Sequence, residues 1–358
     1  MARARPGAAT FEAPPNIALV KYWGVRDRAL ALPYNSSISV SLDRLRSRTR
    51  VAFEPSLEAD EVEINGRPAG GGPREAVVKF LDRVRSLAGT SAHAVVSSEN
   101  NFPTASGLAS SASGFAALAG AATRAAGLTL SDRSLGRLAR FGSGSASRSI
   151  FGGFVEWRAG ARADGQDCYA RSLFGPTHWP ELRDVVVLVR GAPTKAVRSQ
   201  DAMQATVATS PYFGERQREL PGRIARIRSA IGARDAERLF PLVMQECDSF
   251  RWVCETTRPS LDYLTATSRA VLARVQDENR AAGRPIGAYT HDAGAHVHVF
   301  TLRRHVDRLR RSFGEVPGVE RTLELRAGPG ARRVGDDRAL RARGGRSRAR
   351  GARARSSG

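Results

Sequence analysis

Apolar side chains recur at helical spacing in several stretches of the chain. In residues 75–88, for example, Val77, Phe80 and Val84 fall on one face, and Gly89 follows as a helix stop. A helix after Ser131 has a side chain suited to capping its first turn. The same reasoning predicts helices at 75–88, 107–126, 132–138, 224–231, 261–275 and 306–313.

Short apolar runs predict strands at 94–97, 153–157, 185–189, 289–290 and 297–302. Strands and helices do not alternate strictly along the chain, so the pattern favours an α+β fold over a doubly wound parallel sheet. A polar, proline-containing connection at 178–184 marks the expected boundary between an N-terminal domain, 8–182, and a C-terminal domain, 183–328.

The composition is that of an ordinary globular protein, with 358 residues, 41% hydrophobic and 25% charged. No apolar run approaches the ~20 residues that cross a bilayer, and no apolar segment follows the basic start. The three cysteines, Cys168, Cys247 and Cys254, lack the spacing of a disulfide framework or a thiolate metal site. We therefore expect a cytoplasmic protein that does not bind a membrane.

The net charge of +21 is concentrated in part at the C-terminus. Residues 331–358 hold ten arginines and two aspartates, a local charge of +8, which leaves +13 for the remainder. Residues 329–358 have no apolar period and are expected to form a disordered basic tail. The tail is either a solvated appendage or a contact for a phosphate polymer. The surplus elsewhere suits an enzyme with anionic substrates.

A run of small residues and serines at 103–113 is the strongest local feature. Small residues let the backbone approach a ligand, serines offer hydroxyls, and the following helix directs its first amides toward an anion. This is typical of a phosphate cradle, although a small-residue helix packed on a sheet is the alternative. The residues concerned are Pro103, Gly107, Leu108, Ala109, Ser110 and Ser111.

A second serine-rich turn, 142–149, contains Ser143, Gly144, Ser145 and Arg148. The fork of an arginine suits bidentate capture of a carboxylate or phosphate, so this turn is a second candidate anion site. The alternative is a surface loop.

Two further segments carry candidate chemistry. Asp292, in the turn 290–296, is either a base or a turn former. Lys21 and Tyr22 follow an N-terminal apolar run, where Lys21 is either a ligand or a solvated strand end. Three nearby histidines, His291, His296 and His298, invite a metal interpretation, but no known ligand spacing completes it.

Taken in order, these motifs resemble the mevalonate diphosphate decarboxylases of the GHMP small-molecule kinase superfamily. The resemblance covers roughly residues 10–330 and rests on Asn16–Ala18, Lys21–Gly24, Asn35–Ser37, Asn101–Ala105, Gly142–Arg148, Gly152–Trp157, His178–Leu182, Met203, Thr209, Ser210 and Asp292–Gly294. It implies an N-terminal α/β sandwich-like domain, a C-terminal ferredoxin-like domain, and an active site between them. A homodimer is common in such families.

The resemblance implies that ATP, with Mg²⁺, phosphorylates the 3-hydroxyl of mevalonate 5-diphosphate, after which phosphate and carbon dioxide leave. It assigns Asp292 to the hydroxyl and Arg148 to the carboxylate as the catalytic pair. Lys21, Tyr22, Ser143, Gly144 and Ser145 would line the substrate's phosphate end. Pro103 and Gly107–Ser111 would hold the nucleotide, with Ser110 as a magnesium ligand.

The chain departs from the family pattern at several positions, which are Val25 for a lysine, Ser147 for a cysteine, Ala295-His296 for Pro-Asn and Arg251 for a histidine. Because Val25 lacks a charge, either Lys195 or Arg198 replaces the lysine, or the substrate is mevalonate 5-phosphate. A GHMP kinase that does not decarboxylate is a further alternative, although such an enzyme has no need of Arg148. A protein that binds RNA through its basic tail leaves both anion sites unexplained.

Overall fold

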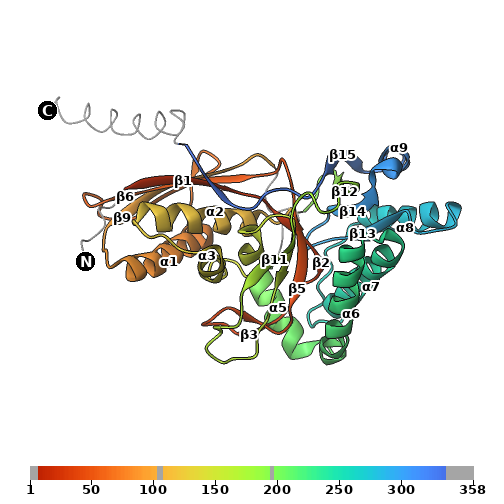
Figure 1. Ribbon diagram of the computed structural model, residues 1–358, viewed down its shortest axis with the longest axis horizontal. Coiled ribbons are helices and arrows are strands. Elements are labelled where there is room, and N and C mark those ends of the chain that lie inside the picture. The colour runs from red at the N-terminus through yellow and green to blue at the C-terminus, as the bar shows by residue number, and fades with distance from the viewer. Residues whose placement is uncertain (1–6, 103–107, 194–196, 336–358) are drawn as a thin grey trace.

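The computed structural model describes residues 7–102, 108–193 and 197–335. The expected α+β class is confirmed, with helices and three larger, mostly antiparallel sheets in two lobes (Figure 1). The nucleotide candidates Pro103 and Gly107 lie outside the described residues, as does Lys195.

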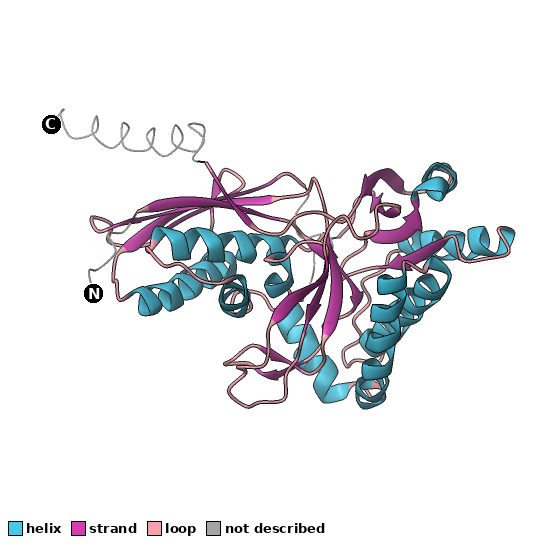
Figure 2. Ribbon diagram, viewed as in Figure 1, coloured by secondary structure: helices cyan, strands magenta, loops and turns pink. Residues whose placement is uncertain are grey.

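The first lobe is built on a six-stranded sheet with the order β16-β1-β6-β9-β7-β8. Three helices cover one face of it (Figure 2) and enclose an alanine-rich core. Gly120 allows this close packing, because a Cβ there would lie 2.3 Å from the ring of Phe11. The elements are β1 (Ala8–Ala13), β6 (Ser47–Glu54), β7 (Glu61–Ile64), β8 (Arg67–Pro68), α1 (Gly71–Ala88), β9 (His93–Asn100), α2 (Ser110–Ala125), α3 (Asp132–Ala139) and β16 (Arg332–Val334).

A second sheet, with the order β11-β10-β5-β2, lies between this lobe and the rest of the molecule. Its strands are β2 (Asn16–Val20), β5 (Ser37–Ser41), β10 (Phe154–Trp157) and β11 (Ala170–Phe174). A small hairpin of β3 (Val25–Asp27) and β4 (Leu32–Pro33) follows β2, and the short helix α4 (Ala146–Ser149) precedes β10.

The second lobe holds a four-stranded antiparallel sheet with the order β13-β14-β12-β15. Its β-α-β-β-α-β succession, with additional helices, is ferredoxin-like. The elements are β12 (Leu182–Val189), α5 (Ser199–Thr209), α6 (Phe213–Ala233), α7 (Ala236–Glu255), α8 (Ala266–Ala281), β13 (Gly287–Thr290), β14 (Val297–Leu302), η1 (Arg303–His305), α9 (Val306–Gly314) and β15 (Val319–Leu325).

One apolar cluster joins the two lobes. It contains Ile17 and Leu19 from β2 together with Phe240 and Val243 from α7, all of them buried. Burying such side chains contributes about 1.5–3 kcal/mol each, so this contact fixes β2 against α7. The residue that follows β2, Lys21, is thereby placed at the junction of the lobes.

Most predicted elements are present, and Ser131 caps α3 by accepting a bond from the Ser134 amide. Helix α7 was not predicted, although its buried residues Leu239, Val243, Cys247, Phe250 and Cys254 have helical spacing. The prediction of a disordered tail from residue 329 onward is wrong for its first residues. Residues 329–335 run along the first lobe, where Arg332–Val334 pair with β1 as strand β16, and 336–358 lie outside the described residues.

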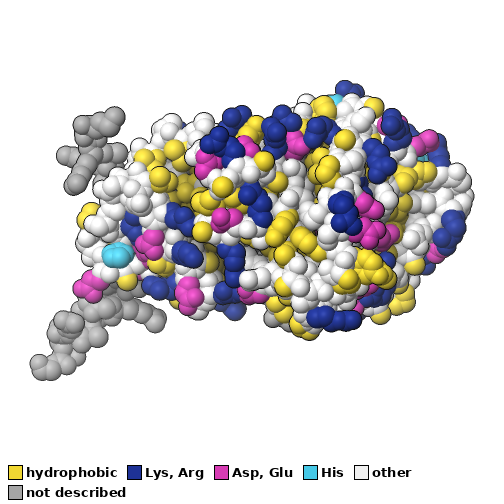
Figure 3. All heavy atoms as spheres, turned by 90° about the horizontal axis from the view of Figure 1, so that it is seen from below, with side chains coloured by type: hydrophobic (Ala, Val, Ile, Leu, Met, Phe, Trp, Pro, Cys, Tyr) yellow, Lys and Arg dark blue, Asp and Glu magenta, His cyan; other side chains and the backbone are white. Residues whose placement is uncertain are grey.

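Within the described ranges no helix is both long and apolar enough to span a membrane. One face of the molecule is seen in Figure 3, where lysine and arginine side chains are spread out with acidic side chains among them. On this face the positive charge is therefore dispersed.

Candidate active site

Arg148 is buried in the first lobe and is held by neutral side chains. Its Nε donates to Asn16 Oδ1 at 2.9 Å and to Ser39 Oγ at 3.0 Å, and its Nη1 donates to Ser37 Oγ at 2.6 Å. Burial lowers the pKa of Arg148 from its ordinary value to about 10, while the nearby Asp292 carboxylate acts in the opposite sense. At neutral pH the group is a desolvated cation with a fixed orientation, which suits it to an anionic ligand.

Asp292 reaches the junction from the second lobe, on the turn between β13 and β14. Its Oδ1 lies 2.8 Å from Lys21 Nζ, and its side chain keeps 25% of its exposure while that of Lys21 keeps 3%. The Gly294 amide donates to the Asp292 carbonyl at 2.7 Å and closes the turn. A half-open carboxylate paired with a buried ammonium can receive or orient a hydroxyl proton.

Hydrogen bonds to the backbone of Lys21 fix its position. Its backbone amide donates to Glu246 Oε1 on α7 at 2.9 Å, and its carbonyl accepts from Asn35 Nδ2 at 2.9 Å. Glu246 in turn pairs with Arg216 and Arg223 of α6. These contacts hold the strand end rigidly, so that the Lys21 side chain points to Asp292.

The serine-rich turn meets Tyr22. A Cβ on Gly144 would lie 2.7 Å from the Tyr22 ring and 2.9 Å from that of Trp157, so only glycine allows this approach. Ser143 Oγ and Ser145 Oγ lie 3.3 Å apart. Burial raises the pKa of the Tyr22 hydroxyl well above its ordinary value, which keeps it a neutral hydrogen-bonding group.

The start of α2 has the features of an anion-binding site. The N-cap, Ala109, adopts a left-handed conformation with φ of 53°, and its own side chain makes no capping hydrogen bond to the helix. A left-handed alanine is strained, and such strain is concentrated at ligand-binding turns. Ser110 and Ser111 begin the helix with Ser111 exposed, while Leu108 is buried and anchors the turn. The uncapped amides and hydroxyls fit phosphate oxygens and a hard cation.

The three histidines have separate structural roles. His298 Nδ1 lies 2.7 Å from Asp184 Oδ2, and His296 Nδ1 accepts from the Val189 amide at 3.1 Å. Burial lowers the pKa of both His291 and His296 to about 4, so both are neutral at pH 7. Within the part of the chain that the structure describes, no three potential ligands lie close enough to hold a metal.

Sequence reasoning named Asn16, Asn35 and Ser37 only as parts of family-like motifs and gave them no role, and it did not name Ser39 or Glu246. A signal for two of them was present, because Ser37 and Ser39 alternate along β5 and therefore share one face. Glu246 gave no such signal, since a single acid in an amphipathic helix is usually solvated. The site as a whole combines a buried cation, a carboxylate on the facing lobe, and a helix start that accepts anions.

Comparison with known proteins identifies relatives along most of the chain. Residues 13–170 match the diphosphomevalonate decarboxylase-like N-terminal domain, and residues 185–327 match the mevalonate 5-diphosphate decarboxylase C-terminal domain. A diphosphomevalonate decarboxylase of Aspergillus fumigatus is 42% identical over 312 residues, which covers 83% of this chain and 77% of the relative.

Solved structures show the same architecture. The mevalonate diphosphate decarboxylase from Staphylococcus aureus superposes with a TM-score of 0.86 at 34% identity, covering 92% of this chain and 98% of that one. A structure in complex with MVAPP, AMPPCP and magnesium superposes with a TM-score of 0.85 at 34% identity, covering 92% of this chain and 99% of that one.

Proposed function

The chain belongs to the diphosphomevalonate decarboxylase family, and from this premise we propose that it converts mevalonate 5-diphosphate and ATP to isopentenyl diphosphate, carbon dioxide, ADP and phosphate. The observation that carries the proposal is the pairing of functional groups across the junction. Asp292 of the second lobe lies 2.8 Å from the ammonium of Lys21, which follows β2, and Asn16 at the start of β2 accepts a hydrogen bond from the buried Arg148. A 3-hydroxy acid presents the two groups that such a pair would bind, a carboxylate and a hydroxyl.

We assign Asp292 to the tertiary hydroxyl of the substrate. Its carboxylate orients the hydroxyl or accepts its proton as the oxygen attacks the γ-phosphorus, and the ammonium of Lys21, 2.8 Å away, compensates the charge. Phosphorylation turns the hydroxyl into a good leaving group. The C–O bond then breaks, and the electrons of the C–C bond to the carboxylate form the new double bond.

We assign Arg148 to the substrate carboxylate. The side chains that accept its hydrogen bonds are all neutral, so a substrate carboxylate would gain a charge-assisted bond there. A fixed guanidinium orients the C–C bond that breaks. Tyr22, Ser143 and Ser145, around Gly144, are proposed to bind the phosphate end of the substrate through their hydroxyl groups.

The uncapped start of α2 fits ATP and Mg²⁺ by its donor set, since backbone amides suit phosphates and the Ser110 hydroxyl suits a hard cation. When bound, ATP with Mg²⁺ supplies the phosphoryl group and neutralises its developing charge. Leu108, Ala109 and Ser111 would complete the described part of this cradle. The related structure in complex with MVAPP, AMPPCP and magnesium supports the assignment.

Domain limits, assembly and location belong to the same proposal. We place the nucleotide-binding domain at 8–182 and the second domain at 183–328, with 329–335 returning to the first. We propose a cytoplasmic homodimer, the commonest closed oligomer. Light scattering on the purified chain would test the dimer by its mass.

The deciding experiment incubates the purified chain with ATP, Mg²⁺ and mevalonate 5-diphosphate. Phosphate, carbon dioxide and isopentenyl diphosphate should form in equal amounts. ADP without carbon dioxide, together with a stable phosphorylated acid, would identify a kinase and overturn the proposal.

One observation favours mevalonate 5-phosphate as a second candidate substrate. Val25 packs against an apolar cluster that includes Trp23 and Phe250, so position 25 offers no charge to a terminal phosphate. Of the basic residues proposed to compensate, Arg198 places its guanidinium against Gly72 at the start of α1. The same assay with both substrates separates the two candidates.

A further inference from the structure

A segment at the end of the chain crosses from the second lobe back to the first. Residues 326–335, here called the strap, follow β15 and end with β16 paired to β1, and Figure 1 shows this path in blue along one side of the molecule. The strap therefore connects the sheet of the second lobe directly to the lobe that carries Arg148.

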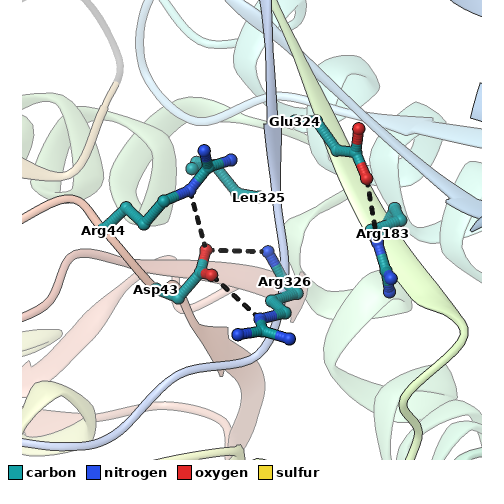
Figure 4. Close-up of a pocket in the computed structure, with 6 residues that line it drawn as sticks. All are labelled: Asp43, Arg44, Arg183, Glu324, Leu325 and Arg326. Atoms are coloured by element: carbon teal, nitrogen blue, oxygen red, sulfur yellow. Dashed lines mark hydrogen bonds and ion pairs between the residues drawn. The ribbon is translucent and has the colours of Figure 1, made fainter.

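The start of the strap is clamped by Asp43, as Figure 4 shows. Asp43 accepts bonds from the Arg326 backbone amide at 3.0 Å and from its Nε at 3.1 Å, and the Asp43 amide donates to the Arg326 carbonyl at 2.8 Å. Beside this clamp, Arg183 of β12 pairs with Glu324 of β15 at 3.0 Å. These residues line a groove of about 270 Å³ at the seam of the lobes.

The middle of the strap contacts the turn that follows Arg148. The Ala331 amide donates to the carbonyls of Ser149 and Ile150, both at 3.1 Å, and the Gly153 amide donates to the Gly328 carbonyl at 2.9 Å. A Cβ on Gly330 would lie 2.3 Å from the Ile150 carbonyl oxygen and 2.7–2.8 Å from neighbouring backbone atoms. At Gly330 the strap thus packs backbone against backbone with no space for a side chain.

Residues 149–153, which the strap contacts, directly follow Arg148 in the sequence and are also joined to it by side-chain hydrogen bonds. Asn16 donates to Ser149 Oγ at 2.8 Å and accepts from Arg148 Nε at 2.9 Å. Ser41 Oγ donates to the Phe151 carbonyl at 2.7 Å. A displacement of residues 149–153 would therefore move the guanidinium and its partners together.

We propose that the strap is a positioning element for the reaction, which sets the turn 149–153, and with it Arg148, relative to the lobe that carries Asp292. The inference rests on the proposed function, because it gives Arg148 the substrate carboxylate to bind. A displacement of about 1 Å at a reacting group can cost on the order of 100-fold in rate. The backbone contacts of the strap restrict such displacements.

The test compares Gly330→Ala with Gly335→Ala, since a Cβ at Gly335 meets no atom within 4 Å. Gly330→Ala should raise the KM for mevalonate 5-diphosphate and lower kcat/KM by about tenfold, with the KM for ATP within about twofold of wild type. Gly335→Ala should match wild type. Equal changes in both KM values, or no change in a folded Gly330→Ala variant, would overturn the proposal.

Asp43→Ala provides a milder test, should Gly330→Ala fail to fold. It loosens only the clamp, so about a threefold rise in the KM for the acid substrate is expected, again without a change for ATP. Asp43→Asn should restore much of the loss, because its amide oxygen can still accept from the Arg326 amide. An unchanged Asp43→Ala variant would also contradict the proposal.

Hydrogen exchange separates this inference from the proposed function. The Gly153 amide, bonded to the strap, should exchange at least about tenfold faster in Gly330→Ala than in Gly335→Ala. This result does not require turnover. An inactive wild-type chain would refute the proposed function whatever the exchange shows, whereas unchanged exchange at Gly153 in an active Gly330→Ala variant would refute the role of the strap alone.

Discussion

Each lobe of the molecule contains buried arginine, and the two sites differ in what surrounds the positive charge. Arg148 in the first lobe is hydrogen-bonded by Asn16, Ser37 and Ser39, which are all neutral. Arg216 and Arg223 in the second lobe share the carboxylate of Glu246, and all three side chains are almost fully buried. The chemistry of arginine is the same in both places, but its partners are not.

The surroundings determine what each group can do. Burial opposes ionisation of Glu246, yet the two guanidinium groups and the Lys21 amide hold its pKa below the usual value. That cluster is compensated internally and fixes α6, α7 and the end of β2. Around Arg148, by contrast, burial lowers the pKa to about 10, which is a cost of folding that an anionic substrate can recover. This difference supports the proposed role of Arg148 as the substrate-binding arginine of the two sites.

The largest effect is expected for Asp292→Asn, which removes the carboxylate that pairs with Lys21 at the junction of the lobes. Without its carboxylate the site loses the proton acceptor, so kcat should fall by at least ~10³-fold, while folding and ATP binding persist. Asp277→Asn, on the exposed side of α8, serves as the control. A variant that keeps more than about a tenth of wild-type kcat would remove Asp292 from the mechanism.

Arg148→Gln tests whether the arginine held by neutral groups serves the substrate rather than the stability of the fold. Loss of the guanidinium should lower kcat/KM for the acid substrate by about 100-fold, since a buried carboxylate loses its charged partner. Stability should change by no more than about 1 kcal/mol, because the substitution also removes the desolvation cost of the cation. Kinetics and urea unfolding measure the two effects, and unchanged kinetics would show that Arg148 does not meet the substrate.

Arg216→Gln tests whether the arginines paired with Glu246 serve mainly the stability of the fold. Removing one member of the Glu246 cluster should lower the free energy of unfolding by about 3 kcal/mol, as expected for breaking a buried ion pair. The loss of kcat/KM should be smaller than for Arg148→Gln, because Arg223 still compensates Glu246. Equal losses of stability in the two variants would break the distinction between the sites.

Lowering the pH should reduce the stability of the folded chain through His291, whose ring contacts the Asp292 carbonyl. Burial lowers the pKa of His291 from 6.5 to about 4 in the folded chain, so between these values the unfolded chain binds more protons. Stability should then fall as pH falls from 6.5 to 4, by up to about 1.4 kcal/mol per pH unit for this group. Urea unfolding of His291→Gln should show a weaker dependence, and an identical one would contradict the assignment.

Val25→Lys adds a charge at the position where the family pattern has a lysine and should have the smallest effect. If the site prefers one phosphate, the added ammonium should shift the kcat/KM ratio toward the diphosphate by about tenfold, the value of one charge-assisted contact. Because Val25 packs on an apolar cluster, some loss of stability should accompany this shift. A chain that already prefers the diphosphate by over a hundredfold, with no response to Val25→Lys, would show that Val25 carries no specificity.

Much of this protein is determined locally by its sequence. The helical stripe at 75–88, the Ser131 cap and the serine-rich turn around Arg148 depend on neighbouring residues, so periodicity and residue type were enough to find them. The motif order also indicated the family. The extent of the tail could not be found in this way, because the strap lacks an apolar period and is held by backbone bonds to residues far away in sequence.

Only the tertiary structure decided which charges meet. Lys21 and Asp292 are 271 positions apart, and the amide of Lys21 meets Glu246 from a third region of the chain. The sequence supplied both arginine sites without distinguishing them, since the free energy of a buried charge depends on the partners and solvent that folding leaves around it. Local spacing carries no information on those partners. Composition and pattern thus determined the elements and the family, whereas packing of β2 against α7 decided that Lys21 and Asp292 would meet at the junction of the lobes.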